Sequence, residues 1–421
     1  MNKNNQKMKP SLLLITQSFP FGIAESSFLK EEIKSLARNF NVHLISRNNK
    51  DTQYVNVPEN VVLYRYHVKE QYNPLLLFLR TLFTYSFFEE LISLVKKKKL
   101  SYNHIKVCIR VQMRTLHFSN YLQTIRNKIN CPVILYSYWN DYACFAATRI
   151  KRKYDFVVSR LHGGDLYELD INDKYQPFKC VYNKDVDLFS FISRMGLSYF
   201  NETYFNVSRR ASVNYLGVPE HPISYRFSNR QDVKIVSFSY VRDIKRIDKI
   251  VDVLSKVDGL RITWIHIGAR YNYNEIRKYA SEKLDGKSNV NYQFIGEMKN
   301  EGALRYISEN EFDFLINVSS TEGMPMTMME AFSMSIPVIG TKVGGVPEVV
   351  RHGYNGYLLD ANFKDADLAH ILYRYASLPF EEKKKLRTNA HNTWKTTFQD
   401  ESNYRSFAHL LIKKFNLYEA K

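Results

Sequence analysis

The sequence of 421 residues has little cysteine and no long hydrophobic run. No stretch of eighteen apolar residues is free of charged or polar breaks, so a membrane-spanning helix is not predicted. The start of the chain is polar and basic, and we expect no secretory signal peptide there. The four cysteines have neither metal-ligand spacing nor the density of a disulfide framework, which indicates reduced thiols in a cytoplasmic protein.

A glycine-rich dinucleotide motif is also missing. No Gly-x-Gly-x-x-Gly follows any run that we assign to a strand, which argues against a dehydrogenase. Acidic residues are outnumbered, with 42 Asp and Glu against 60 Lys and Arg and a net charge of +18. This surplus indicates an anionic partner, such as a nucleic acid, a membrane surface or a phosphorylated substrate. Because no recognised nucleic-acid module accompanies the charge, we predict no nucleic-acid partner.

Apolar runs alternate with segments of helical periodicity, which predicts an α/β fold built from Rossmann-like units. The first series begins with a strand over residues 11–16, a helix over 25–37 and a strand over 42–46. A second series begins at Val233, after a polar stretch that contains proline. We therefore predict an N-terminal domain over residues 1–219, a linker over 220–232 and a C-terminal domain over 233–400.

The stretch over residues 312–334 predicts a strand, a loop and a helix. Residues 312–318 are apolar enough for a buried parallel strand, and the polar run that follows them indicates a loop. Pro325 suits the first turn of a helix, where its missing N–H group would be unpaired anyway. Such a helix start offers free backbone N–H groups and a favourable dipole to an anion, at the carboxyl end of a strand. These N–H groups lie near Met324, Met326 and Thr327.

Two carboxylates flank this predicted anion site. Glu322 lies in the loop, and Glu330 lies one turn into the helix. A carboxylate beside an anion is repelled, so we expect hydroxyl groups of a sugar or a ribose as its partners. Two glutamates eight positions apart would alone be ordinary surface residues, and the strand, loop and helix around them favour a ligand site.

The region 319–348, which includes the later Gly344-Gly345-Val-Pro-Glu run, resembles the donor-binding core of the family-four retaining glycosyltransferases. These enzymes have the GT-B fold, and the resemblance covers most of the chain. It implies two Rossmann-like domains that face a cleft, with a last helix over residues 401–421 that crosses back to the first domain. It also implies that a sugar moves from a nucleotide-diphosphate donor to an acceptor hydroxyl, with retention and without a metal or cofactor.

The resemblance assigns roles to several residues of the C-terminal domain. Glu330 would hold the ribose, and Glu322 would position the sugar hydroxyls together with backbone groups of Gly323 and Met324. The helix start near Met326 would stabilise the charge on the departing nucleoside diphosphate.

Lys245 is predicted to bind the diphosphate from a loop just beyond the first strand of the second domain. It resembles the family's phosphate-binding lysine. The family often has an arginine five positions earlier, where this chain has Tyr240, and we predict Arg242 as the substitute. We expect the side chain of Arg246 to point away from the diphosphate. The departure at Tyr240 admits an alternative, a catalytically weak or inactive nucleotide-sugar-binding protein.

Four residues of the N-terminal domain also match the family's patterns. His162 stands between a predicted strand and a glycine pair, and we expect it to be exposed at the cleft and to contact the donor sugar near the anomeric carbon; a core histidine is the alternative. Asp165 either caps the next helix or touches substrate. In the loop before the first helix, Gly22 would allow a close approach of the diphosphate, and Glu25 would cap that helix or face the acceptor.

A mostly apolar helix is predicted over residues 75–95, and four lysines follow it at positions 96–99. An apolar helix beside a basic run is typical of a segment that lies on an anionic membrane. A core-packed helix with a solvated, charged end is the alternative. With the overall basicity, the pattern favours the inner face of the cell membrane, and the family's habits suggest a lipid-linked glycan of surface polysaccharide synthesis as the acceptor.

Overall fold

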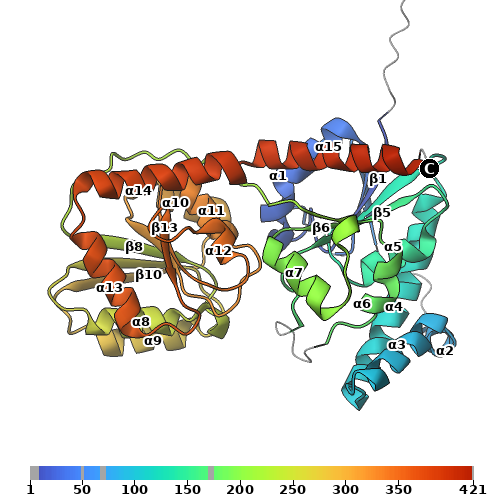
Figure 1. Ribbon diagram of the computed structural model, residues 1–421, viewed down its shortest axis with the longest axis horizontal. Coiled ribbons are helices and arrows are strands. Elements are labelled where there is room, and N and C mark those ends of the chain that lie inside the picture. The colour runs from blue at the N-terminus through green and yellow to red at the C-terminus, as the bar shows by residue number, and fades with distance from the viewer. Residues whose placement is uncertain (1–8, 49–51, 67–72, 169–174, 420–421) are drawn as a thin grey trace, which may run out of the picture. The chain divides into compact units, whose positions relative to one another are not determined.

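The computed structural model describes residues 9–48, 52–66, 73–168 and 175–419. The chain divides into two compact units (Figure 1). Unit 1 comprises Met1–Tyr215 and Glu401–Lys421, and unit 2 comprises Leu216–Asp400.

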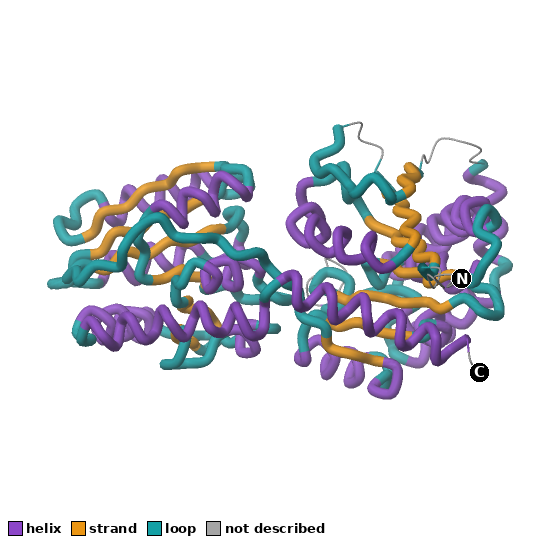
Figure 2. Tube along the Cα trace, turned by 90° about the horizontal axis from the view of Figure 1, so that it is seen from above, coloured by secondary structure: helices purple, strands orange, loops and turns teal. Residues whose placement is uncertain are grey.

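Unit 1 contains a parallel sheet of seven strands in the order β3-β2-β1-β4-β5-β6-β7, with helices on its two faces (Figure 2). The strands are β1 (Ser11–Thr16), β2 (Asn41–Ser46), β3 (Val62–Arg65), β4 (Val133–Ser137), β5 (Phe156–Leu161), β6 (Leu188–Phe191) and β7 (Ala211–Val213). The helices are α1 (Ile23–Asn39), α2 (Pro74–Leu82), α3 (Tyr85–Lys96), α4 (Tyr102–Arg126), α5 (Tyr142–Ile150), α6 (Lys179–Tyr182), α7 (Arg194–Thr203) and α15 (Asp400–Glu419).

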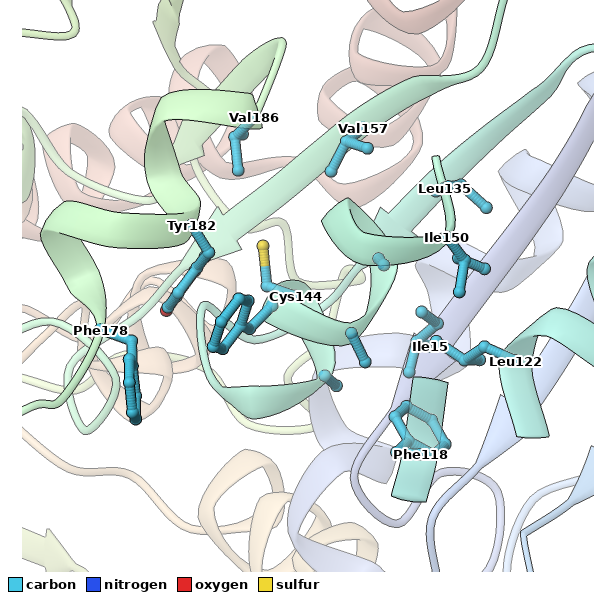
Figure 3. Packing of buried hydrophobic residues seen from close by; sticks show 14 of the residues in the cluster. Ile15, Phe118, Leu122, Leu135, Cys144, Ile150, Val157, Phe178, Tyr182 and Val186 are labelled. Atoms are coloured by element: carbon cyan, nitrogen blue, oxygen red, sulfur yellow. The ribbon is translucent and has the colours of Figure 1, made fainter. Parts of the chain in front are cut away.

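The central strands of unit 1 are buried on both faces, as the near-continuous apolar runs of the sequence predict. Along β1, Leu13 and Ile15 join a core on one face, where Ile15 lies beside Phe118 and Leu122 of α4 (Figure 3). Leu12 and Leu14 join a second core on the opposite face, together with residues of α1 and α15.

The last helix, α15, packs on unit 1, as the resemblance to the GT-B fold implied. Its buried side chains Phe407, Leu411 and Phe415 belong to the second core. The ring of Phe407 lies 5.6 Å from that of Tyr136 on β4, and the ring of Phe415 lies 6.3 Å from that of Phe156 on β5. The C-terminal segment thus completes one face of a sheet whose other members come from the first half of the chain.

Unit 2 contains a parallel sheet of six strands in the order β10-β9-β8-β11-β12-β13. The strands are β8 (Val233–Phe238), β9 (Ile262–Ile267), β10 (Val290–Gly296), β11 (Phe314–Asn317), β12 (Val338–Thr341) and β13 (Gly356–Leu359). The helices are α8 (Ile247–Lys256), α9 (Tyr273–Leu284), α10 (Asn300–Glu309), α11 (Met326–Ser333), α12 (Val346–Val349), α13 (Asp365–Ala376) and α14 (Phe380–Thr393).

The helix predicted over residues 75–95 is in fact two helices, α2 and α3. The backbone of Phe83 and Thr84 bonds back to the carbonyl groups of Arg80 and Thr81, and this tight turn ends α2. Thr84 is extended, with φ −83° and ψ 135°, and its hydroxyl bonds to the carbonyl of Thr81. This local bonding competes with a continuous helix. Within the described ranges, no helix combines the length and apolar character that crossing a bilayer requires.

Candidate functional site

The candidate site of unit 2 lies where the order of its strands reverses. β8 and β11 are neighbours in the sheet, and the chain continues from them in opposite directions, to β9 and to β12. In an open parallel sheet, ligands bind outside the carboxyl ends of the two strands at such a switch point. The segment after β8 carries Lys245, and the segment after β11 carries Glu322.

Glu322 and Lys245 form an ion pair across this switch point. The Oε1 atom of Glu322 lies 2.6 Å from Nζ of Lys245. The same oxygen accepts hydrogen bonds from Oγ of Ser319 at 2.8 Å and from Nδ2 of Asn317 at 3.0 Å. The lysine side chain is 22% exposed and the glutamate side chain 11%. The sequence predicted that both residues follow strands at the carboxyl edge of the sheet. The structure adds that they form an ion pair.

Arg246 fixes the relation between the two loops. Its guanidinium group donates to the carbonyl oxygens of Val318 at 2.6 Å and Ser319 at 3.0 Å, both after β11, and to that of Ala361 at 2.7 Å. These bonds hold Arg246 to the backbone of the two loops, and the expectation that it points away from the diphosphate stays a prediction. Its backbone is left-handed, with φ 49°, and this orientation has no signal in the sequence pattern.

The glycine pair after β12 supports the loop that carries Glu322. Gly344 has a φ of 46°, and a side chain there would overlap the carbonyl oxygen of Glu322. A side chain on Gly345 would overlap the carbonyl oxygen of Gly323, which instead accepts a hydrogen bond of 2.9 Å from the Gly345 N–H group. Only glycine allows so close a contact between the two backbones.

Glu330 is buried on α11, with 5% of its surface exposed. Its Oε1 accepts a hydrogen bond of 3.2 Å from Nδ2 of Asn300 on α10. Burial raises the pKa of Glu330 to about 7, because the charged form is poorly solvated there. The carboxyl group is thus ready to change its charge near neutral pH if a ligand supplies hydrogen-bond donors.

The remaining predicted residues of unit 2 divide into two groups. Met324 is buried, and Met326 begins α11, whose start has no side-chain cap in the structure. Arg242, by contrast, is exposed, and its guanidinium carbon lies 5.3 Å from the ring centre of Tyr271 in the loop after β9. Tyr240, at the position where the family often has arginine, is 41% exposed, and the guanidinium of Arg270 lies 4.7 Å from its ring centre.

Glu25 of unit 1 stabilises the loop after β1. It is 2% exposed, and its carboxylate accepts hydrogen bonds from the backbone N–H groups of Gln17, Ser18 and Phe19 and from Nε1 of Trp139. Glu25 therefore does not cap α1, which corrects one of its two expected roles, and a contact with the acceptor stays a prediction. A side chain at Gly22, which precedes α1, would overlap Ser18, so the close approach at this glycine is to the protein's own loop.

His162 is buried in an aromatic cluster, with 5% of its surface exposed, and not open to solvent as expected. Its ring centre lies 4.4 Å from that of Trp139 and 4.7 Å from that of Tyr138. Burial, with a smaller contribution from the nearby Arg160 cation, lowers the pKa of His162 well below its ordinary value. Neither ring nitrogen has a hydrogen-bond partner among the described residues, so a neutral imidazole with unused capacity lies beneath the loop held by Glu25.

Asp165 links the loops after β4 and β5. Its carboxylate accepts hydrogen bonds of 2.7 Å from the backbone N–H groups of Asn140 and His162. Burial raises the pKa of Asp165 to about 6, although Lys179 opposes the shift. The two hydrogen bonds join Asp165 to backbone groups of neighbouring loops. They therefore correspond neither to a helix cap nor to a substrate contact, the two alternatives for this residue.

The fold and the region of the site have relatives among known proteins. Residues 226–393 match the family model of the glycosyl transferases group 1. The chain is 28% identical over 127 residues to N-acetyl-alpha-D-glucosaminyl L-malate synthase of Bacillus anthracis, covering 30% of this chain and 32% of that protein. It is 28% identical over 144 residues to the O-antigen biosynthesis glycosyltransferase WbnH of Escherichia coli, covering 34% and 37%. The chain therefore spans about a third of the length of these curated relatives.

The similarity to solved structures extends over both units. HepE of Anabaena, solved in complex with UDP-glucose, aligns with a TM-score of 0.65 and 15% identity, over 96% of this chain and 99% of that one. At this identity the alignment is evidence of a common fold. The two parallel sheets of seven and six strands, with the last helix on the first unit, are those of the GT-B fold.

Proposed function

Because residues 226–393 match the family model of the glycosyl transferases group 1 and the chain has the GT-B fold, we propose that the protein transfers a sugar from a nucleotide-diphosphate donor to an acceptor hydroxyl. The observation that carries the proposal is the ion pair of Lys245 and Glu322 at the switch point of unit 2, next to the start of α11. This arrangement offers one cation, one carboxylate and a helix N-terminus to the same ligand.

In the proposed donor complex, the diphosphate takes Glu322's place as the partner of Lys245. The lysine is a flexible point charge with three donors, so it can change partner without a rearrangement of the backbone. Glu322 then keeps its bonds from Asn317 and Ser319 and accepts from hydroxyls of the sugar. Backbone groups of Gly323 and Met324 complete the contacts to the sugar.

Glu330 holds the ribose in this proposal. Its carboxyl group is buried and has one described hydrogen-bond donor, Asn300. Two hydroxyl donors of a ribose would therefore stabilise it more than they would stabilise an exposed carboxylate. Those donors favour the charged form and lower the pKa of Glu330 from about 7. Donor binding is therefore expected to release a proton near neutral pH.

The sugar is transferred with retention at the anomeric carbon. As the glycosidic bond to the diphosphate breaks, negative charge develops on the leaving oxygen, and Lys245 with the N–H groups at the start of α11 stabilises it. The leaving phosphate accepts the proton of the acceptor hydroxyl, so the reaction needs neither a separate base nor a metal ion. The predicted position of His162 beside the reacting carbon remains a prediction, as does the role of Arg242 as a second phosphate ligand.

The acceptor is a glycan, and we propose that it is lipid-linked and that the protein meets it at the cytoplasmic face of a membrane. Two observations support this: the O-antigen biosynthesis glycosyltransferase is among the relatives, and the net charge is +18. A surface of this charge is attracted to anionic lipid and to phosphate-linked carriers.

A binding protein without turnover is the second candidate, and the surroundings of Tyr240 favour it. At the position of the family's usual arginine, the chain has a tyrosine under Arg270, and the nearest substitute, Arg242, lies over Tyr271. If neither arginine reaches the phosphate, Lys245 alone stabilises the leaving group. Donor affinity without transfer or donor hydrolysis would identify this case.

The test is thermal stabilisation of the purified protein by UDP-, GDP-, ADP- and TDP-sugars in metal-free buffer. A ligand that binds the folded state raises the midpoint by mass action. We expect one nucleotide class to do so, and Lys245→Ala and Glu330→Gln to abolish the rise. Lys342→Ala serves as a matched control, because Lys342 is an exposed lysine of unit 2 that pairs with Asp360. Stabilisation that survives in both site variants would move the donor site elsewhere, and no stabilisation by any donor would contradict the transfer proposal.

A further inference from the structure

Helix α3 has apolar side chains on both of its faces. Its buried face carries Phe87 and Leu94, which pack in the core of unit 1. The opposite face carries Tyr85, Phe88, Ile92 and Val95, which are between 50% and 81% exposed. The outward residues recur at spacings of three, four and three, which places them along one stripe. A surface helix ordinarily has polar side chains on that side, so the outward stripe needs a separate explanation.

The apolar surface continues onto α2 and beyond α3. On α2, Thr81 and Leu77 are buried, while Leu75, Leu76 and Leu79 are between 44% and 66% exposed. Phe83, in the turn between the helices, is 81% exposed. Leu100 and Tyr102 extend the patch at the other end. We call these outward residues the hairpin patch, and its members are Leu75, Leu76, Leu79, Phe83, Tyr85, Phe88, Ile92, Val95, Leu100 and Tyr102.

The exposed charges beside the hairpin patch are mostly cationic. Lys96, Lys97, Lys98 and Lys99 directly follow the outward stripe of α3, and all four are exposed, as is Arg80 on α2. Two of these lysines have partners in unit 1, since Lys99 pairs with Glu168 at 2.9 Å and Nζ of Lys97 lies 3.8 Å from Sγ of Cys180. Lys96 and Lys98 are therefore the lysines that the patch offers to a lipid surface. The stretch 73–106 contains two acidic residues, and neither is free in the structure. Glu90 is buried, and Glu89 is paired with Lys184. The hairpin therefore presents ten exposed apolar side chains with exposed cations beside them.

We propose that the hairpin patch docks on the surface of an anionic lipid bilayer. The apolar side chains would enter the boundary between headgroups and acyl chains, and the lysines would meet lipid phosphates. Tyrosine rings such as those of Tyr85 and Tyr102 suit this depth, because one end of the ring is apolar and the other polar. α2 and α3 lie together at one end of unit 1 (Figure 1).

A second copy of the chain fits the hairpin patch less well than a bilayer does. In a twofold dimer the same surface meets itself, so the lysine run of one copy would lie near the cations of the other. Such like charges oppose association, whereas an anionic bilayer attracts them. Docking on lipid requires neither donor nor acceptor, and it can therefore be measured independently of sugar transfer.

The experiment is co-sedimentation of the full chain with vesicles of phosphatidylcholine, with and without phosphatidylglycerol. We expect binding to the vesicles that contain phosphatidylglycerol, and weaker binding as salt is raised. The double variants Phe83→Ser, Ile92→Ser and Lys96→Glu, Lys98→Glu should each weaken binding by about tenfold or more, since the first removes apolar contacts and the second reverses charges.

Matched controls come from exposed residues of the same types elsewhere. Leu417→Ser removes a side chain that is 55% exposed on α15, the same fraction as for Ile92, and Lys384→Glu, Lys385→Glu reverses two exposed lysines of α14. Both controls should bind vesicles like the wild type, and a cooperative thermal unfolding transition like that of the wild type should show that every variant is folded.

Two results would overturn the proposal. One is vesicle binding that is equal in the hairpin variants and the controls, because the contact would then lie elsewhere or be a general effect of net charge. The other is a dimer in light scattering that Phe83→Ser, Ile92→Ser dissociates while the wild type ignores vesicles, because the patch would then bind a second copy.

Discussion

The two units have the same kind of parallel sheet, but they use the carboxylates at its carboxyl edge differently. In unit 1, the carboxylates of Glu25 and Asp165 accept hydrogen bonds from backbone N–H groups of neighbouring loops. In unit 2, Glu322 pairs with a lysine side chain, and Glu330 is buried beside one amide. A backbone N–H group is fixed by the course of the chain, whereas a side-chain partner can rotate away. Glu25 and Asp165 therefore hold the shape of loops, and we expect Glu322 and Glu330 to be available to a ligand.

The largest expected effect concerns the side-chain partner in unit 2. Lys245→Ala should lower sugar transfer by about a hundredfold to a thousandfold, because it removes the cation that stabilises the leaving diphosphate. The midpoint of unfolding should change little, since the pair with Glu322 is partly exposed. Product chromatography with the preferred donor gives the rate, and Lys342→Ala is the control. If Lys245→Ala lowered the midpoint of unfolding and left sugar transfer unchanged, the ion pair of unit 2 would have a structural role and not a ligand-binding one.

The next effect concerns the backbone partner in unit 1. Glu25→Ala leaves several buried N–H groups unpaired, so the free energy of unfolding should fall by about 3 kcal/mol or more. Urea unfolding measures this change. Glu31→Ala is the control on the same helix, because the side chain of Glu31 pairs with Lys34 near the surface. If Glu25→Ala kept full stability and lost only acceptor affinity, the carboxylate would be a ligand group after all.

A third prediction uses the pH dependence of Glu330. Its pKa is raised by burial to about 7, so the folded state binds a proton more tightly than the unfolded state does. The stability from this proton is complete below the ordinary pKa of the group and is lost as the pH rises through about 7. Glu330→Gln should therefore gain about 1 to 3 kcal/mol over the wild type between pH 5 and pH 8 in the absence of ligand.

Urea unfolding at the two pH values measures this difference. Glu348→Gln offers a comparison at another glutamate of unit 2, which is only partly buried. Equal pH profiles of stability for Glu330→Gln and the wild type would mean that the carboxyl group of Glu330 is solvated. The comparison of the two units would then depend on Glu322 alone in unit 2.

The smallest effect concerns Arg242. Its contact with the ring of Tyr271 is an exposed cation–π interaction, worth about 0.5 to 1 kcal/mol. Arg242→Ala should therefore weaken nucleotide binding by about twofold to fivefold if the arginine only supports the loop. Titration calorimetry distinguishes this from the much larger loss expected of a phosphate ligand, which would confirm the role that the sequence suggested for Arg242.

Patterns local to the chain predicted much of this organisation. The strand, loop and helix around Glu322 follow from apolar runs, a polar break and Pro325, and they placed Glu322 and Lys245 at the edge where the structure has them. The GT-B fold, and the similarity of residues 226–393 to the glycosyl transferases group 1, were likewise apparent from the region 319–348. These signals are readable because each depends on neighbours in sequence.

The features that the sequence did not show are mostly contacts between distant residues. Trp139 is 114 positions from the Glu25 carboxylate that it contacts, and Val318 is 72 positions from Arg246. Nothing near Glu25 shows that it turns back to the preceding loop, and nothing near Arg246 shows its left-handed backbone. The burial of His162 depends on rings from other elements. The break at Thr84 is local, but a threonine among apolar residues is too common to mark a helix end.

The ion pair of Lys245 and Glu322 has a consequence for discrimination among anions. A bare phosphate that displaced Glu322 would leave this carboxylate without a cation and beside another negative charge. In the proposed donor complex, a sugar diphosphate supplies hydroxyl donors to Glu322 at the same moment and so satisfies both members of the pair. After the proposed transfer, the hydroxyls would depart with the product, and Glu322 would again compete for Lys245. The site would thus favour the loaded donor over the spent nucleotide and assist its release.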